Sequence, residues 1–145
     1  MGFGLGAAIG GCIASGKKRT ILFTGDGSFG MSLQELATAV SQNLPLTIVI
    51  FNNGVLGMVR QWQTMFYEKH YSHTTLQRKT DFAALARAFG AKGKKITSLA
   101  ELERALYAPA PNVPTVLDCQ LDMDEFVLPM IPPGGCVQDL ITRRN

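Results

Sequence analysis

Hydrophobic residues follow two different spacings along this chain of 145 residues. Short, continuous apolar runs are typical of strands that are covered on both faces. Apolar residues three or four positions apart instead predict amphipathic helices. The predicted elements, in chain order, are strand 20–25, helix 32–43, strand 46–52, helices 56–66, 81–90 and 98–107, and strand 115–121.

Polar residues mark the ends of three of these helices. Ser32 precedes residues 33–43, and Glu35 follows it at the third position, which together form a capping-box pattern. Asp81 and Ser98 stand at the N-cap positions of the last two helices, and Gly90 marks a helix end. These signals support the helix boundaries independently of the apolar pattern.

The order of strands and helices predicts the fold class. It is typical of an α/β domain, a doubly wound parallel sheet with helices on both faces. A chain of this length fits one domain, so residues 1–145 are predicted to form a single domain with its own core. We find no internal repeat and no low-complexity linker in the sequence.

Composition and charge argue against several classes of function. The net charge is only +3, and the basic residues are dispersed apart from 17–19 and 92–95, so binding to nucleic acid is not expected. No apolar run approaches the roughly 20 residues of a membrane span. No basic leader precedes the apolar start, and the 3 cysteines are too few and scattered for a disulfide framework. A cytoplasmic protein is therefore expected.

Polar residues follow the first two predicted strands at the point where each strand ends. Asp26, flanked by Gly25 and Gly27, follows the first strand, and Asn53 follows the second. The carboxyl ends of parallel strands meet at one edge of a sheet, so these residues are expected to lie close together. Their hard oxygens suit Mg²⁺ or Ca²⁺ rather than zinc, while the glycines and the N–H of Ser28 suit a phosphate group. Taken singly, each motif is also an ordinary turn.

The spacing of the two motifs resembles that of thiamine diphosphate enzymes. The chain reads GDG, then 24 residues, then NN, which is the diphosphate and metal motif of that class. The segments MGFGLGAAIG, NNGVLGMVRQWQTMFYEKHYSHT and VLPMIPPGG are similar to the carboxy-terminal, diphosphate-binding domain of the acetolactate (acetohydroxyacid) synthase large subunit. The resemblance covers nearly the whole chain and is weakest between residues 93 and 113.

The resemblance implies a set of site residues. Asp26, Asn53 and the backbone carbonyl of Val55 match the metal ligands. Met58, Val59 and Trp62 match residues at the mouth of the substrate channel. Gly6 departs from the family, which usually has proline there. The residues that match the cofactor-binding positions are Met1, Gly25, Asp26, Gly27, Ser28, Asn53, Val55, Gly57 and Met58.

The family's activity is the condensation of two pyruvates, or of pyruvate with 2-oxobutyrate, with loss of carbon dioxide in branched-chain amino-acid synthesis. In the family, FAD lies in a central domain, and the glutamate that activates the cofactor lies in a pyrimidine-binding domain, usually of a neighbouring subunit. Neither Glu35 nor Glu68 matches that glutamate, so no catalytic residue is expected in this chain, and the chain alone is expected to be inactive. A homo-oligomer is expected.

Two alternatives remain open at the level of sequence. The chain could belong to another decarboxylase or carboligase with the same cofactor, such as pyruvate oxidase or benzoylformate decarboxylase, although GMVRQWQ and PMIPPGG argue against that. It could also be a stand-alone, non-catalytic binding module. A neighbouring reading frame that encodes the pyrimidine domain would favour a split or truncated enzyme over such a module.

Overall fold

The computed structural model describes residues 1–77 and 80–143. Its elements form two compact units, one made of Met1–Gly54 with Gln77–Leu121, the other of Val55–Leu76 with Asp122–Asn145. The first unit contains α1 (Phe3–Ala14), β1 (Thr20–Gly25), α2 (Asp26–Phe29), η1 (Leu33–Glu35), α3 (Leu36–Ser41), β2 (Leu46–Asn52), α5 (Phe82–Ala88), β3 (Lys92–Ile96), α6 (Leu99–Tyr107) and β4 (Thr115–Gln120). The second contains α4 (Gly57–Phe66) and η2 (Val137–Asp139).

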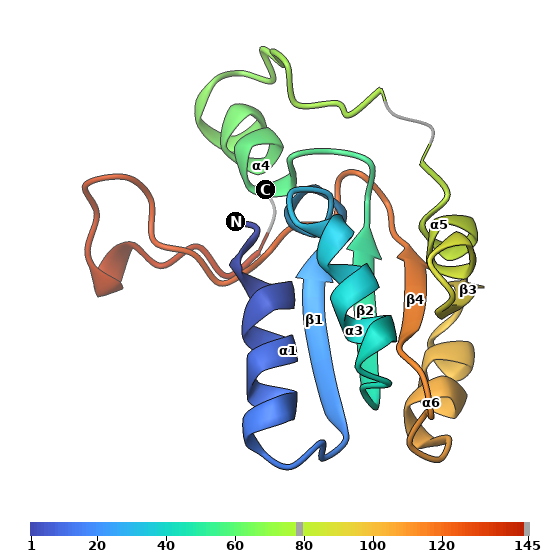
Figure 1. Cartoon of the computed structure of the whole chain (residues 1–145). Coiled ribbons are helices and arrows are strands. Elements are labelled where there is room, and N and C mark those ends of the chain that lie inside the picture. Colours follow the sequence, from blue (N-terminus) through green and yellow to red (C-terminus); the bar gives the residue numbers. More distant parts are fainter. Residues whose placement is uncertain (78–79, 144–145) are drawn as a thin grey trace. The chain divides into compact units, whose positions relative to one another are not determined.

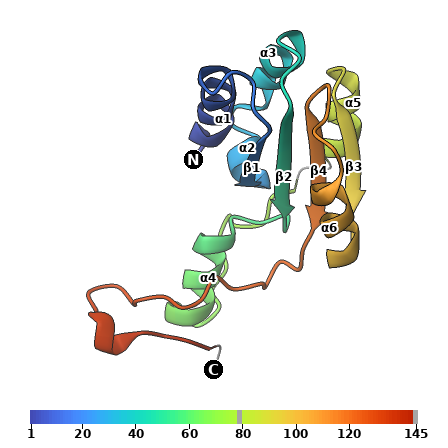
Figure 2. The same ribbon diagram turned by 90° about the horizontal axis from the view of Figure 1, so that it is seen from below.

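The first unit is built on a four-stranded parallel sheet. Its strand order is β1-β2-β4-β3, which can be followed from left to right in Figure 1 and again in the turned view of Figure 2. After β2 the chain passes to the far edge of the sheet, forms β3, and returns through α6 to place β4 between β2 and β3. Parallel neighbours joined by helices are the expected α/β arrangement.

Helices cover both faces of this sheet. On one face, α1, α3 and α5 pack against β2 and β4 through a core that includes Leu5, Leu36, Ile48 and Phe82. On the other face, α6 packs through Leu102 and Leu106, among others, against a smaller cluster of strand residues, Val49, Ile96, Leu117 and Cys119. The predicted fold class, a doubly wound parallel sheet with helices on both faces, is therefore confirmed.

The sequence prediction missed strand β3. Its residues, KGKKI, carry three lysines and a glycine, and only Ile96 among them is buried. Because β3 is an edge strand with one neighbour, it needs no continuous apolar run and shows none. The pattern therefore predicted three strands where the sheet has four.

The predicted helix 32–43 is also shorter and less regular than expected. The chain forms the 3₁₀ turn η1 and then α3, which ends at Ser41. Ser32 makes no cap hydrogen bond, because its backbone (φ −138°, ψ 18°) does not have the extended geometry of an N-cap. Its hydroxyl is buried without a hydrogen-bond partner in the described chain. Glu35 instead accepts a hydrogen bond from the Thr38 hydroxyl, so the predicted capping box is wrong.

The other predicted helix ends are confirmed. The Asp81 carboxylate accepts a hydrogen bond from the Ala84 N–H at 2.8 Å, which caps α5. The Ser98 hydroxyl accepts one from the Glu101 N–H at 3.4 Å, which caps α6. Gly90, just after α5, has a φ of 86°, a conformation that glycine adopts without strain.

Gly93 allows α5 to approach the sheet closely. A Cβ atom at this position would lie 2.0 Å from the carbonyl oxygen of Ala83, which is backbone and cannot move independently of the helix. We expect Gly93→Ala to lower the free energy of unfolding by about 3 kcal/mol, since α5 would have to leave its packed position. Thermal and urea unfolding would measure the loss.

Gly6 provides the matched control for this substitution. It lies in α1, and nothing in the structure comes within 4 Å of a Cβ added there. Gly6→Ala should raise stability by about 0.5–1 kcal/mol, because alanine loses less backbone entropy than glycine in a helix. Equal stabilities of the two variants would show that the packing of α5 against β3 is looser than the structure indicates.

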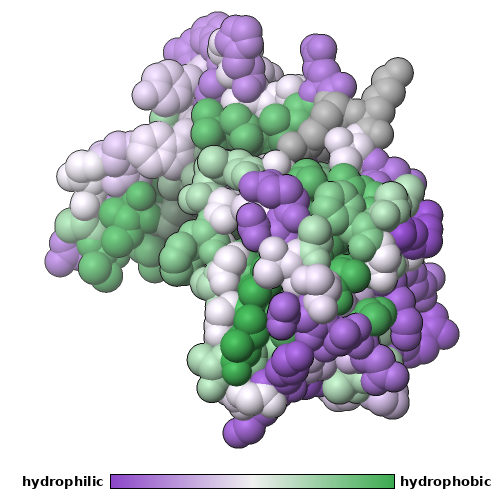
Figure 3. All heavy atoms as spheres, viewed as in Figure 1, coloured by the Kyte–Doolittle hydropathy of each residue, from purple (hydrophilic) through white to green (hydrophobic). Residues whose placement is uncertain are grey.

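The surface over α1 is apolar and uncharged, as the pale and green band in Figure 3 shows. Phe3 and Ile13 are both exposed on this helix. None of the helices in the described part of the chain is both long and apolar enough to span a membrane.

Candidate functional site

The carboxyl ends of β1 and β2 bring the two polar motifs to one edge of the sheet (Figure 1). Gly25 is the last residue of β1 and pairs with Phe51 of β2, so the two strands end side by side. Asp26 follows as the first residue of α2, and Asn53 directly follows β2. The sequence prediction that both motifs leave neighbouring parallel strands therefore agrees with the structure.

Asp26 is buried, with only 3% of its surface exposed. A carboxylate in this environment, next to an asparagine on the adjacent strand end, offers the hard oxygen ligands that Mg²⁺ prefers. Within residues 1–77 and 80–143, no three His, Cys, Asp or Glu side chains gather into a metal-ligand cluster. An ion that takes few protein ligands and completes its shell with phosphate oxygens and water, as Mg²⁺ does, suits a carboxylate such as that of Asp26.

The backbone around these residues fits a close approach by a ligand. A Cβ added to Gly25 would meet nothing within 4 Å, so the chain borders open space there. Gly54, directly after Asn53, has a φ of 68°, which favours glycine and turns the chain away from β2. The Ser28 hydroxyl accepts a hydrogen bond from the Gly2 N–H at 3.0 Å and links α2 to the start of α1, beside the exposed Met1.

Asp118 is a second buried carboxylate near this edge, and sequence reasoning missed it. It lies in β4 with 1% of its surface exposed, and the Asn52 amide donates a hydrogen bond to its Oδ1 at 2.8 Å. Burial raises the pKa of Asp118, the hydrogen bond from Asn52 opposes that rise, and the negative charges of Asp81 and, to a smaller extent, Asp26 add to it. Asn52 is therefore held by a carboxylate of the neighbouring strand. An aspartate inside an apolar strand was the available signal.

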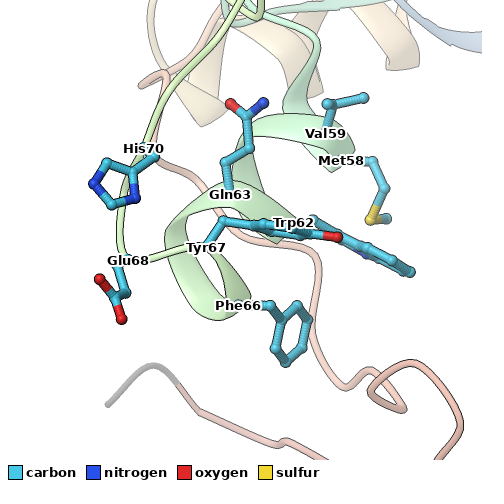
Figure 4. Close-up of a pocket in the computed structure, with 8 residues that line it drawn as sticks. All are labelled: Met58, Val59, Trp62, Gln63, Phe66, Tyr67, Glu68 and His70. Carbon is cyan, nitrogen blue, oxygen red and sulfur yellow. The ribbon is translucent and has the colours of Figure 1, made fainter.

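The second unit holds a pocket on α4 (Figure 4). Its volume is about 590 Å³, and its walls are mainly aromatic and apolar. Trp62 and Phe66 pack edge to face, with ring centroids 5.8 Å apart. The three predicted channel residues all line it, together with five others: Met58, Val59, Trp62, Gln63, Phe66, Tyr67, Glu68 and His70. The structure thus brings the predicted channel residues to one apolar pocket of ligand size.

The remaining predicted cofactor residues of the second unit lie at the start of α4. Val55 is buried and forms an isolated β-bridge with Thr75, and the Leu56 N–H donates to the Thr74 carbonyl at 2.7 Å. Gly57 is the first residue of α4. These backbone bonds hold the segment before α4 in a defined conformation.

Two further residues of α4 bind the tail of the second unit, and sequence reasoning assigned them no role. The Arg60 guanidinium donates to the Asp124 carboxylate at 2.8 Å and lies over the Tyr71 ring, 4.1 Å from its centroid. The buried Gln61 amide donates to the Val127 carbonyl at 3.0 Å and accepts from the Val127 N–H at 2.8 Å. Two consecutive polar residues directly before Trp62 were the only signal.

Gln61→Ala should release the tail from α4. The substitution removes both hydrogen bonds to Val127, at an expected local cost of about 1–3 kcal/mol. Amide hydrogen exchange at Val127 would then become faster by roughly fivefold to a hundredfold, which is that free energy converted to a rate. The matched control is Gln63→Ala, because Gln63 makes the same two-bond contact with the backbone of Ser72 instead. Faster exchange at Val127 in the control alone would contradict the assignment.

Comparisons with known proteins place these observations in a family. A profile of the family "Thiamine pyrophosphate enzyme, C-terminal TPP binding domain" matches residues 1–119. The chain is 42% identical over 144 residues to the acetolactate synthase isozyme 2 large subunit of Escherichia coli K12, covering 99% of this chain and 26% of that protein. It is also 42% identical over 142 residues to the probable acetolactate synthase large subunit of Methanocaldococcus jannaschii, covering 97% of this chain and 24% of that protein. The chain thus spans about a quarter of the length of these relatives.

Solved structures lead to the same class of protein. The benzoylformate decarboxylase of Polynucleobacter necessarius superposes with a TM-score of 0.72 at 27% identity, over 86% of this chain and 24% of that one. The thiamine diphosphate-dependent 4-hydroxybenzoylformate decarboxylase of Rhodococcus jostii RHA1 superposes with a TM-score of 0.70 at 28% identity, over 84% of this chain and 23% of that one. The parallel sheet, its strand-end motifs and these matches together show that the chain belongs to the C-terminal, thiamine pyrophosphate-binding domain family of thiamine pyrophosphate enzymes.

Proposed function

We propose that residues 1–145 act as one domain that binds the diphosphate end of thiamine diphosphate through Mg²⁺. The observation that carries this proposal is the placement of buried Asp26 and of Asn53 beyond the ends of neighbouring parallel strands. Asp26 supplies a charged oxygen ligand and Asn53 a neutral one. The backbone carbonyl of Val55 is the proposed third protein ligand.

The other proposed cofactor contacts are residues at the same edge of the sheet and residues that match the family's cofactor-binding positions. Gly25 and Gly27 allow the backbone to approach the diphosphate, and the Ser28 segment offers N–H donors. Met1, Gly57 and Met58 are the residues proposed to contact the cofactor beyond its diphosphate. Met58, Val59 and Trp62 line the pocket on α4, and we assign them to the entry of substrate.

The proposed parent activity is acetolactate synthesis from two pyruvates, or from pyruvate and 2-oxobutyrate, in branched-chain amino-acid biosynthesis. The names and 42% identity of the relatives support it. Thiamine diphosphate supplies the nucleophilic carbon and the electron sink for decarboxylation. This chain's residues bind and orient it, while a pyrimidine-binding domain of the same or a neighbouring subunit completes the site. FAD belongs to another domain of the parent enzyme, and a cytoplasmic location fits the three free cysteines.

A calorimetric titration tests the proposed function directly. Thiamine diphosphate is titrated into the purified chain with Mg²⁺, and again with EDTA in its place. We expect heat of binding with Mg²⁺ and at least about a tenfold weaker affinity without it, because the ion neutralises the diphosphate charge. Binding that is equal under both conditions would contradict the proposal.

A second candidate function is decarboxylation of an aromatic 2-oxo acid. The similarity to two benzoylformate decarboxylases favours it, although the identity to them, 27–28%, is well below the 42% to acetolactate synthases. Both functions use the same cofactor contacts. Once the domain is joined to its parent chain, competition between pyruvate and benzoylformate would distinguish them.

We expect the chain to associate with itself. The apolar surface of α1, including exposed Phe3 and Ile13, has no charged residue to oppose association. Light scattering at high protein concentration should show dimers or larger species, and Ile13→Lys should shift the distribution towards the monomer. Leu99→Lys is the control, because Leu99 is an exposed apolar residue on a different helix. A wild-type chain that stays monomeric would count against this expectation.

A further inference from the structure

A groove of about 750 Å³ lies in the first unit, on the face of the sheet that α6 covers. Its floor is formed at the amino ends of the strands. Thr47, Thr115 and Lys92 form one row across β2, β4 and β3, because Thr115 is the register partner of both other residues. Leu117 and Lys94 form the next row on the same face. The diphosphate candidates, by contrast, lie at the carboxyl ends of the strands.

Positive charge converges on this groove. Arg19 comes from the segment before β1, Lys92 and Lys94 from β3, and Arg104 from α6. The Arg19 guanidinium donates to the Leu106 carbonyl, which holds it at the end of α6. None of the described residues that line the groove is acidic. Four like charges drawn together from three parts of the chain raise the potential in the groove and favour an anion there.

Nearby carboxylates do not neutralise the groove. Lys95 pairs with Asp81 at 3.1 Å, but it faces away from the groove, as alternate residues of a strand do. Lys94 and Arg104 lie close enough to Glu101 to help lower the pKa of its carboxyl, after the larger effect of the Thr97 N–H. That N–H donates to Glu101 at 3.0 Å and holds the carboxylate beside Thr97 rather than in the groove.

Thr47 adds a hydroxyl to the lining of the groove. Thr47 borders the groove with only 3% of its surface exposed. A threonine hydroxyl at the floor of a cationic groove can donate a hydrogen bond to an anion bound there.

We propose that this groove binds an organic phosphate of about nucleotide size. Arginine and lysine side chains are the usual partners of phosphate oxygens, and a threonine hydroxyl can donate to one. The apolar part of such a ligand fits against Ala105, Ala108 and Leu117, which also line the groove. The volume falls within the range of small-molecule sites. The proposal is independent of thiamine diphosphate binding, since it uses the opposite ends of the strands.

The test is a calorimetric titration of the full chain with ATP, and separately with inorganic phosphate, in EDTA. Both the wild type and Asp26→Ala are titrated. The lack of Mg²⁺, and in the variant the loss of the Asp26 carboxylate, keep the ligand from the proposed diphosphate site. We expect ATP to bind, with phosphate at least about tenfold weaker because it lacks the apolar contacts. Loss of ATP binding in Asp26→Ala would place the ligand at the other edge and overturn the inference.

Matched variants test the geometry of the groove. Lys92→Gln with Lys94→Gln should weaken ATP binding at least about tenfold, and Thr47→Val about threefold to tenfold through loss of one hydrogen bond. Lys95→Gln, on the same strand but the opposite face, should change it less than about twofold. Circular dichroism checks that each variant folds. The three lysines are exposed, so their substitution is not expected to disturb the core. An equal loss in Lys95→Gln, or no binding of ATP to the wild type, would overturn the inference.

Discussion

Asp26→Ala is expected to abolish Mg²⁺-dependent binding of thiamine diphosphate. The substitution removes the only charged side chain among the three proposed metal ligands, and leaves the diphosphate charge poorly neutralised. The affinity for the cofactor in the presence of Mg²⁺ should fall at least about a hundredfold. Calorimetric titration of the wild type and the variant, under identical Mg²⁺ concentrations, measures the difference.

Two controls separate metal binding from folding. Asn53→Ala should weaken binding less than Asp26→Ala, because it removes a neutral ligand. Val55→Ala should leave metal affinity within about twofold, since the proposed ligand is a backbone carbonyl. Thermal unfolding without cofactor shows whether each variant is folded, which matters because Asp26 and Val55 are both buried. Equal Mg²⁺ affinity in the wild type and Asp26→Ala would refute the assignment of the metal site.

A protein made of these 145 residues alone is expected to form no acetolactate, even with saturating thiamine diphosphate and Mg²⁺. The family's activating glutamate lies in a pyrimidine-binding domain, and neither Glu35 nor Glu68 matches it. A positioned proton-transfer group typically contributes about 10²–10⁴-fold. Without a pyrimidine pocket, the reacting groups of the cofactor would also rarely meet in productive geometry, which lowers the reaction rate further.

The measurement is acetolactate formed from pyruvate by the purified chain, with Asp26→Ala as the control for contaminating host enzyme. Adding the pyrimidine-binding and central domains as a separate chain should restore turnover if the surfaces dock. Turnover that requires Asp26 but no added partner would mean that the activating carboxylate lies within this chain.

The local elements of this protein were largely determined by its sequence. Strand β2 carries a continuous apolar run because both of its faces are covered, while β1 and β4 carry shorter apolar runs. Asp81 and Ser98 cap α5 and α6 as predicted, because a cap depends on residues only three positions apart. The meeting of the Asp26 and Asn53 segments was also predictable, since parallel neighbouring strands end at the same edge.

Only the tertiary structure decided the features that depend on distant partners. Strand β3 exists because β4 offers it an open edge, so its lysines and glycine gave no strand signal. Ser32 failed as a cap because the chain around it is folded into η1. Asn52 finds Asp118 66 residues away, and Gln61 finds Val127 at the same separation. Hydrogen bonds between residues so far apart leave no periodic pattern, and the cationic groove, assembled from β3, α6 and Arg19, leaves none either.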